Sequence, residues 1–149
     1  MRTTAFTPMR TTATFLFALL LAMAPSFGGD NKGSVPKDAA ELLAWLPGTI
    51  WEIHSATKQP AGEGYLMFCE DGVILKLDAD GSLGESRIWG VARDMRVLWG
   101  RGNMRVMIFK KEFSEFIDNM YGTSGKRIDD PEIRKKFERM HPGKTKVST

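Results

Sequence analysis

The chain has 149 residues, of which 42% are hydrophobic, 10% aromatic and 26% charged, and its formal net charge at pH 7 is +3. These proportions exclude an intrinsically disordered chain, which would be poor in aromatic and β-branched residues. The 15 glycines follow no three-residue period, which excludes a collagen-like chain. We therefore expect one globular domain with short appendages.

Residues 1–26 are predicted to be a secretory signal peptide. The first 29 residues contain no acidic residue, Arg2 and Arg10 lie near the start, and residues 15–24 form a continuous apolar run. That run is about half the ~20 residues that a membrane-spanning helix needs. Cleavage before Phe27 would place the mature chain in the periplasm or outside the cell, and an organellar transit peptide is the alternative. Because export also removes the two arginines, we expect no nucleic-acid partner.

A flexible leader, residues 27–35, precedes the predicted domain, residues 36–128. The leader is rich in glycine and polar residues. Asp38 and Glu41 have the spacing of a helix-capping box, and Pro47-Gly48 would end that helix. The sequence thus predicts a short amphipathic helix whose apolar face contains Leu42, Trp45 and Leu46.

Six segments of alternating polarity, separated by short turn-rich breaks, are predicted to be β-strands. Short connections require neighbouring strands to be antiparallel, because a parallel crossover needs a dozen or more residues. The six predicted strands are Thr49–Ser55, Gly64–Cys69, Val73–Asp78, Glu85–Ala92, Arg96–Gly100 and Met104–Lys110.

The alternation also predicts which side chains face the core. Trp51 and Ile53 share one face of the first strand. We expect Val73, Leu75 and Leu77 to face the core opposite Lys76, and Val106 and Ile108 to face it opposite Arg105. Some strands are apolar on both faces, so the second face of the sheet must also be partly covered. The segment Phe113–Ile117 fits either a strand or a helical turn.

Residues 129–149 are predicted to form a C-terminal amphipathic helix followed by a basic tail. Asp130 can cap this helix, Pro131 suits its first position, and its apolar face would contain Ile133, Phe137 and Met140. Six basic residues lie in this segment and could contact an anionic surface. They are Arg134, Lys135, Lys136, Arg139, Lys144 and Lys146.

Three elements stand out between residues 46 and 116: the run Leu46-Pro47-Gly48-Thr49-Ile50-Trp51, the strand Gly64-Tyr65-Leu66-Met67-Phe68 leading to Asp71-Gly72, and Trp89. Together they resemble small exported bacterial proteins with a lipocalin-like β-meander. The resemblance implies a mainly β fold, either an antiparallel β-meander or a small lipocalin-like barrel, flanked by the two predicted helices. It also implies a structural tryptophan, Trp51, near one end of the sheet.

The sequence contains no recognisable catalytic, zinc, phosphate-loop or dinucleotide motif, and we predict no metal and no cofactor. Cys69 is the single cysteine, which indicates either a buried thiol or a reactive one. The segment Asp78–Ser82 resembles a calcium loop superficially, but the glycine comes two positions early. We therefore expect a hairpin turn stabilised by an aspartate side chain.

Four aromatic residues are the predicted ligand-binding candidates: Trp51, Tyr65, Trp89 and Trp99. If they face a cavity, they would bind a small apolar or planar ligand, and otherwise they fill the core. Five arginines in the later hairpins are expected on a solvated outer face. These are Arg87, Arg93, Arg96, Arg101 and Arg105.

The sequence thus favours an exported, non-catalytic binding or interaction module. One alternative is a hydrolase-type enzyme that assembles its site from His54, Asp71 and Cys69. The other is an accessory subunit of a cell-envelope assembly that uses the basic tail to contact a protein partner or an anionic surface.

Overall fold

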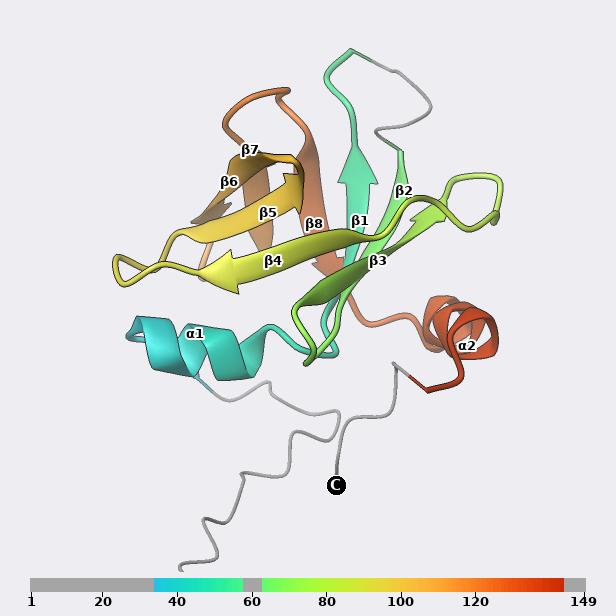
Figure 1. Ribbon diagram of the computed structural model, residues 1–149, viewed down its shortest axis with the longest axis horizontal. Coiled ribbons are helices and arrows are strands. Elements are labelled where there is room, and N and C mark those ends of the chain that lie inside the picture. Colours follow the sequence, from blue (N-terminus) through green and yellow to red (C-terminus); the bar gives the residue numbers. More distant parts are fainter. Residues whose placement is uncertain (1–33, 58–62, 144–149) are drawn as a thin grey trace, which may run out of the picture.

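The computed structural model describes residues 34–57 and 63–143. Eight antiparallel strands pair in chain order, and the last pairs back with the first, so that the sheet is a closed barrel (Figure 1). The strands are β1 (Ile50–His54), β2 (Gly64–Phe68), β3 (Val73–Asp78), β4 (Arg87–Val91), β5 (Val97–Arg101), β6 (Asn103–Lys110), β7 (Glu115–Asp118) and β8 (Ser124–Ile128). The helices are α1 (Ala39–Trp45) and α2 (Pro131–Met140).

The predicted fold class, a mainly β barrel with one helix before it and one after it, is confirmed. All six predicted strands are present as β1–β6; β3 has the predicted boundaries, and the boundaries of the others differ by at most two residues. The predicted signal peptide, residues 27–33 of the leader and the basic tail from residue 144 lie outside the described residues. In the described part of the chain, neither helix is long and apolar enough to cross a membrane.

The barrel is closed by two strands that the six-strand prediction lacks. The ambiguous segment Phe113–Ile117 divides into the end of a turn and the start of β7. β8 pairs with both β7 and β1, although its sequence, Ser-Gly-Lys-Arg-Ile, shows no apolar alternation. At Gly125 an added Cβ would lie 2.0 Å from Cε1 of Phe116, so the missing side chain makes room for that ring. β8 is therefore defined by its partners and by packing rather than by its own pattern.

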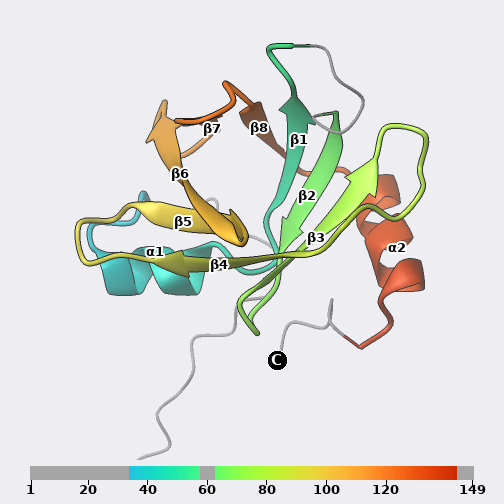
Figure 2. The same ribbon diagram turned by 45° about the horizontal axis from the view of Figure 1, so that its top comes forward.

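α1 closes one end of the barrel. Asp38 caps the helix by accepting a hydrogen bond from the Glu41 backbone N–H (2.8 Å), and the Glu41 carboxylate accepts one from the Lys37 N–H (2.8 Å). Leu42 and Trp45 on this helix belong to the cluster of buried side chains inside the barrel. Figure 2 shows α1 lying beneath β4 and β5, where it contacts β4.

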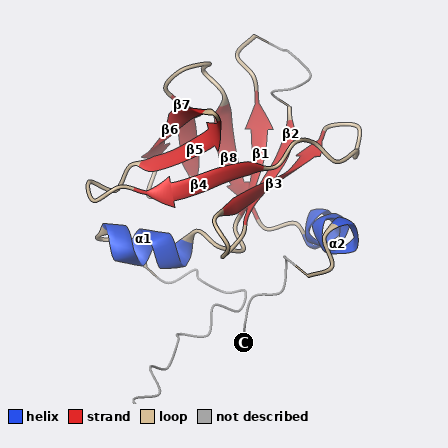
Figure 3. Cartoon of the chain, in the orientation of Figure 1, coloured by secondary structure: helices blue, strands red, loops and turns tan. Residues whose placement is uncertain are grey.

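The second helix covers the outer face of the sheet. Asp130 caps α2 by accepting hydrogen bonds from the Glu132 and Ile133 N–H groups, and Pro131 occupies the first turn. The two helices lie at different sides of the barrel (Figure 3). α2 buries Ile133 and Phe137 in an outer cluster with Ile50, Met67, Cys69, Leu75 and Leu77. Met140, which was predicted on the same face, is 40% exposed.

The predicted faces of β3 and β6 are wrong. Lys76 lies opposite Leu66 and Arg105 lies opposite Trp99, and both of these partners are buried inside the barrel. Directly opposed residues project from the same face of a sheet, so Lys76 and Arg105 point into the interior. Leu75 and Leu77 instead face α2, and Ile108 is 48% exposed on the outside. On β3, alternation identifies two faces but does not tell which one is the barrel interior, because α2 buries the outer face.

Candidate functional site

The two ends of the barrel interior differ in chemistry. The end covered by α1 also carries the β2–β3, β4–β5 and β6–β7 turns, since successive antiparallel strands reverse direction. The opposite end carries the β1–β2, β3–β4, β5–β6 and β7–β8 loops. Charged residues of the interior face gather toward this opposite end, and two of them contact one indole ring. We call this set the charged mouth, and it consists of Lys76, Asp78, Arg87, Trp99, Arg105 and Asp118.

Two of the three cations in the charged mouth have a carboxylate partner. Lys76, only 3% exposed, forms an ion pair with Asp78 two residues further along β3. Arg105 Nη1 lies 3.3 Å from Oδ2 of Asp118, and the Asp118 side chain is fully buried. The other Asp118 oxygen accepts hydrogen bonds from the backbone N–H groups of Met120 and Tyr121, both 2.8 Å long. Asp118 therefore fixes the β7–β8 loop and balances one guanidinium at the same time.

Arg87 is the third cation, and its environment is different. Its Cζ lies 5.0 Å from the centre of the Trp99 ring, while the Arg105 Cζ lies 3.9 Å from the same centre. Within residues 34–57 and 63–143, no carboxylate oxygen lies within ion-pair distance of the Arg87 guanidinium. Burial lowers the pKa of Arg87 and the nearby Arg105 charge lowers it further, which outweighs the opposite effect of Glu85, Asp118 and Asp78.

The indole that these guanidiniums approach also carries an unpaired donor. Trp99 is fully buried, and its Nε1 has no hydrogen-bond acceptor in the described part of the chain. The other two interior tryptophans among the predicted candidates are satisfied. Trp51 Nε1 donates to Thr49 Oγ1 (2.9 Å) and Trp89 Nε1 donates to the Cys69 carbonyl (3.1 Å). Trp99 therefore belongs both to the buried interior cluster and to the charged mouth.

Three of the four predicted ligand-binding residues lie together, and one does not. Trp51, Trp89 and Trp99 belong to the interior cluster, where Trp51 packs against Phe109 and Phe116 at ring-centre distances of 5.4 Å. Tyr65 points outward and packs against the cluster beneath α2.

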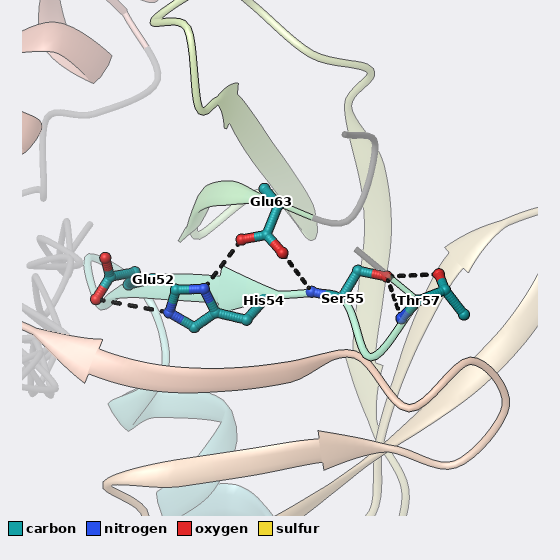
Figure 4. A network of polar contacts seen from close by, with 5 residues as sticks. All are labelled: Glu52, His54, Ser55, Thr57 and Glu63. Atoms are coloured by element: carbon teal, nitrogen blue, oxygen red, sulfur yellow. Dashed lines mark hydrogen bonds and ion pairs between the residues drawn. The ribbon is translucent and has the colours of Figure 1, made fainter. Parts of the chain in front are cut away.

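The residues of the hydrolase alternative are not brought together. His54 ends β1 at the mouth end, whereas Cys69 and Asp71 follow β2 near the α1 end. His54 instead takes part in an exposed network shown in Figure 4: its Nδ1 lies 3.0 Å from Glu63 Oε2 and its Nε2 lies 3.9 Å from Glu52 Oε2. The other Glu63 oxygen accepts the Ser55 N–H (3.0 Å). That backbone hydrogen bond, followed by the one with His54, lowers the pKa of Glu63.

The prediction of a solvated arginine face is right for three of the five arginines and wrong for two. Arg93, Arg96 and Arg101 are exposed, and the last two form ion pairs with Asp94 and Glu85. Arg87 and Arg105 turn inward and belong to the charged mouth, and this inward direction was not predicted from the sequence. One signal was available: the tight turn at Arg101-Gly102-Asn103 places Arg105 opposite Trp99, and opposed residues share a face.

Two further candidates from the sequence are the Asp78–Ser82 segment and Cys69. The expected aspartate-stabilised turn is present, since Asp80 Oδ1 accepts hydrogen bonds from both the N–H and the hydroxyl of Ser82. The described residues hold no group of three or more His, Cys, Asp or Glu side chains that could bind a metal ion. Cys69 is buried.

A shallow outer pocket of about 230 Å³ lies between β3, β4 and β5, lined by Val73, Ser86, Arg87, Ile88, Gly100, Arg101 and Gly102.

The basic C-terminal segment is described as far as residue 143. Arg134 donates a hydrogen bond to the Gly48 carbonyl (3.0 Å), and Lys135 forms an ion pair with Glu132. Arg134 therefore ties α2 to the start of β1 instead of pointing freely into solvent.

Comparison of the chain with protein-family models, with curated proteins and with solved structures finds no match. The function must be argued from the geometry of the barrel.

Proposed function

We propose that this protein is an exported, non-catalytic binding module that holds a small ligand at the charged mouth of its barrel. One observation carries the proposal: charged side chains project into a barrel whose other end is packed with aromatic and aliphatic groups. Burying charge is costly, and apolar residues of similar size would stabilise the fold at least as well. Charges inside one end of a barrel are therefore better explained by a ligand than by folding.

Trp99 is the aromatic residue that fits this role best. It was one of four candidates for contact with a small apolar or planar ligand, and it lies against both arginines of the mouth. Trp51 and Trp89 have their indole donors satisfied within the protein. The separation of His54 from Cys69 and Asp71 supports binding over hydrolysis, because nucleophile and base must be within hydrogen-bond reach. Export is proposed from the amino-terminal pattern of residues 1–26.

Native mass spectrometry, without reducing agent, on protein recovered from its own export compartment tests this proposal. We expect a chain that begins at Phe27 and carries a constant additional mass, which is lost on denaturation. A bare chain, with no additional mass in repeated preparations, would contradict the proposal.

A further inference from the structure

We infer that the charged mouth binds the oxyanion group of a small molecule, a carboxylate, phosphate or sulfate, through the guanidinium of Arg87, with Arg105 and the Trp99 indole beside it. This inference rests on the proposed function and adds the chemical class of the ligand. It depends on three observations: the charge balance of the mouth, the convergence of two arginines, and an unpaired indole donor.

The charge balance of the mouth leaves one cation in excess. Lys76 is balanced by Asp78 and Arg105 by Asp118. Arg87 projects from the interior face of β4, and its side chain has no ion-pair partner within the described residues. A partly desolvated guanidinium without a counterion is unfavourable for folding. An anionic ligand would supply the missing charge.

The two arginines approach one ring from opposite sides of β5. Arg87 comes from β4 and Arg105 from β6, the strands that flank β5. Their Cζ atoms lie 5.0 and 3.9 Å from the Trp99 ring centre, so the two carbons are less than about 9 Å apart. An oxyanion that lies beside the ring can contact both guanidiniums at this separation through different oxygens, because each contact adds a charge-assisted N–H···O bond of about 2.8 Å to the extent of the groups themselves.

The Trp99 donor supports the same ligand chemistry. Its buried Nε1–H lacks an acceptor among residues 34–57 and 63–143, and oxyanions are strong acceptors. A neutral apolar ligand would leave both the guanidinium of Arg87 and this N–H unsatisfied. An oxyanion accounts for both.

The decisive variant is Arg87→Gln, and Arg101→Gln is its matched control. Arg101 ends β5 at the same end of the barrel, and its substitution changes the net charge equally. However, it is 69% exposed and already paired with Glu85. Both variants and the wild type would be titrated at constant ionic strength with sodium benzoate, with sodium phosphate, with sodium sulfate and with benzyl alcohol, which has the ring of benzoate but no carboxylate. The indole N–H resonance of Trp99, assigned with Trp99→Phe, reports binding at the mouth.

We expect saturable shifts of the Trp99 resonance with at least one of the three anions and no saturation with benzyl alcohol. The preferred anion distinguishes a carboxylate site from a phosphate or sulfate site. Loss of a charged hydrogen-bonding partner weakens binding by roughly tenfold or more, so Arg87→Gln should show at least that loss. Arg101→Gln should stay within about twofold of the wild type, since exposed ion pairs contribute little.

The melting temperature separates a ligand contact from a structural role. Because Arg87 has no counterion among the residues that the structure describes, Arg87→Gln should melt at or above the wild-type temperature in anion-free buffer. A lower melting temperature with unchanged anion affinity would overturn the inference. If Arg87→Gln does not fold, Arg87→Lys serves instead, and it should bind the anion more weakly because an ammonium lacks the planar fork of donors. Wild-type affinity in a folded Arg87→Lys would also overturn the inference.

Two outcomes distinguish this inference from the proposed function. Equal affinity for benzyl alcohol and benzoate, unaffected by Arg87→Gln, would overturn the anion site while the mouth remained a binding site. No shift of the Trp99 resonance with any probe, together with a bare chain in native mass spectrometry, would overturn both.

Discussion

The two ends of the barrel interior differ in the residues that fill them. The α1 end is aromatic and aliphatic, and the mouth end is charged. At the α1 end, the rings of Trp51, Phe109, Phe113 and Phe116 pack in edge-to-face or tilted pairs, and Trp45 of α1 contacts Phe113. At the mouth end, Trp99 meets two guanidiniums. The first arrangement removes apolar area from water, which stabilises the fold. The second places charge where it costs stability. This difference is the basis of our proposal that one end maintains the structure and the other end binds a ligand.

The largest expected effect lies at the packed end. Trp51 is fully buried and contacts two phenylalanine rings, so Trp51→Ala should lower the free energy of unfolding by about 3 to 5 kcal/mol. Ile88 on the outer face is 57% exposed, and Ile88→Ala should cost less than about 0.5 kcal/mol. Urea denaturation measures both. Similar losses in the two variants would mean that the interior near α1 is not the stabilising core.

A second test concerns the balanced charges of the mouth. Asp118→Asn keeps the oxygen that accepts the Met120 and Tyr121 N–H groups but removes the negative charge beside Arg105. Breaking a buried ion pair leaves the remaining charge uncompensated, so we expect a loss of about 3 kcal/mol in urea denaturation. Glu85→Gln removes the exposed partner of Arg101 and should cost less than about 1 kcal/mol.

The Asp118→Asn variant also tests the difference between Arg105, which has a carboxylate partner, and Arg87, which has none among the described residues. With two guanidiniums lacking a counterion, added phosphate should raise its melting temperature more than that of the wild type, because a ligand that binds the folded state stabilises it. An equal or smaller rise would show that Asp118 does not balance Arg105.

The third test concerns the strand that closes the barrel. Gly125→Ala would place a Cβ against the Phe116 ring, so the expected cost is about 1 to 3 kcal/mol. Gly90→Ala is the matched control, since a Cβ there meets nothing within 4 Å, and it should be neutral or slightly stabilising. Combining Gly125→Ala with Phe116→Leu should cost less than the two single changes added together. Additive losses in urea denaturation would show that the ring and the glycine do not interact.

β8 and the charged mouth illustrate what the sequence could and could not predict. Turn residues and alternation correctly predicted β1–β6, both helix caps and the mainly β fold. β8 was missed because its structure depends on pairing with β1 and β7, which are distant or weakly patterned in the sequence. The inward direction of Arg87 and Arg105 was missed because charged residues on a strand are usually solvated. The register of the β5–β6 hairpin contradicts that expectation for Arg105, and the alternation with Trp89 and Val91 contradicts it for Arg87.

The smallest expected effect lies on the outer rim of the mouth end, where Glu63 accepts the Ser55 N–H and contacts His54. These hydrogen bonds hold the pKa of Glu63 below its ordinary value, so its carboxylate favours the folded state. The stabilisation is complete above the unfolded pKa of about 4.3 and is lost as the pH falls through the lower folded pKa. Glu63 is partly exposed, so the size is a few tenths of a kcal/mol.

Urea denaturation of wild type and Glu63→Gln between about pH 6 and pH 3 should therefore show a difference in unfolding free energy that shrinks toward low pH. The Ser55 N–H is the larger cause of the lowered pKa and His54 the smaller one, so His54→Ala should reduce this pH dependence without abolishing it. Complete loss in His54→Ala would assign the effect to the imidazole. In that case the contact with the His54 imidazole, rather than the Ser55 N–H, would be what holds the pKa of Glu63 below its ordinary value.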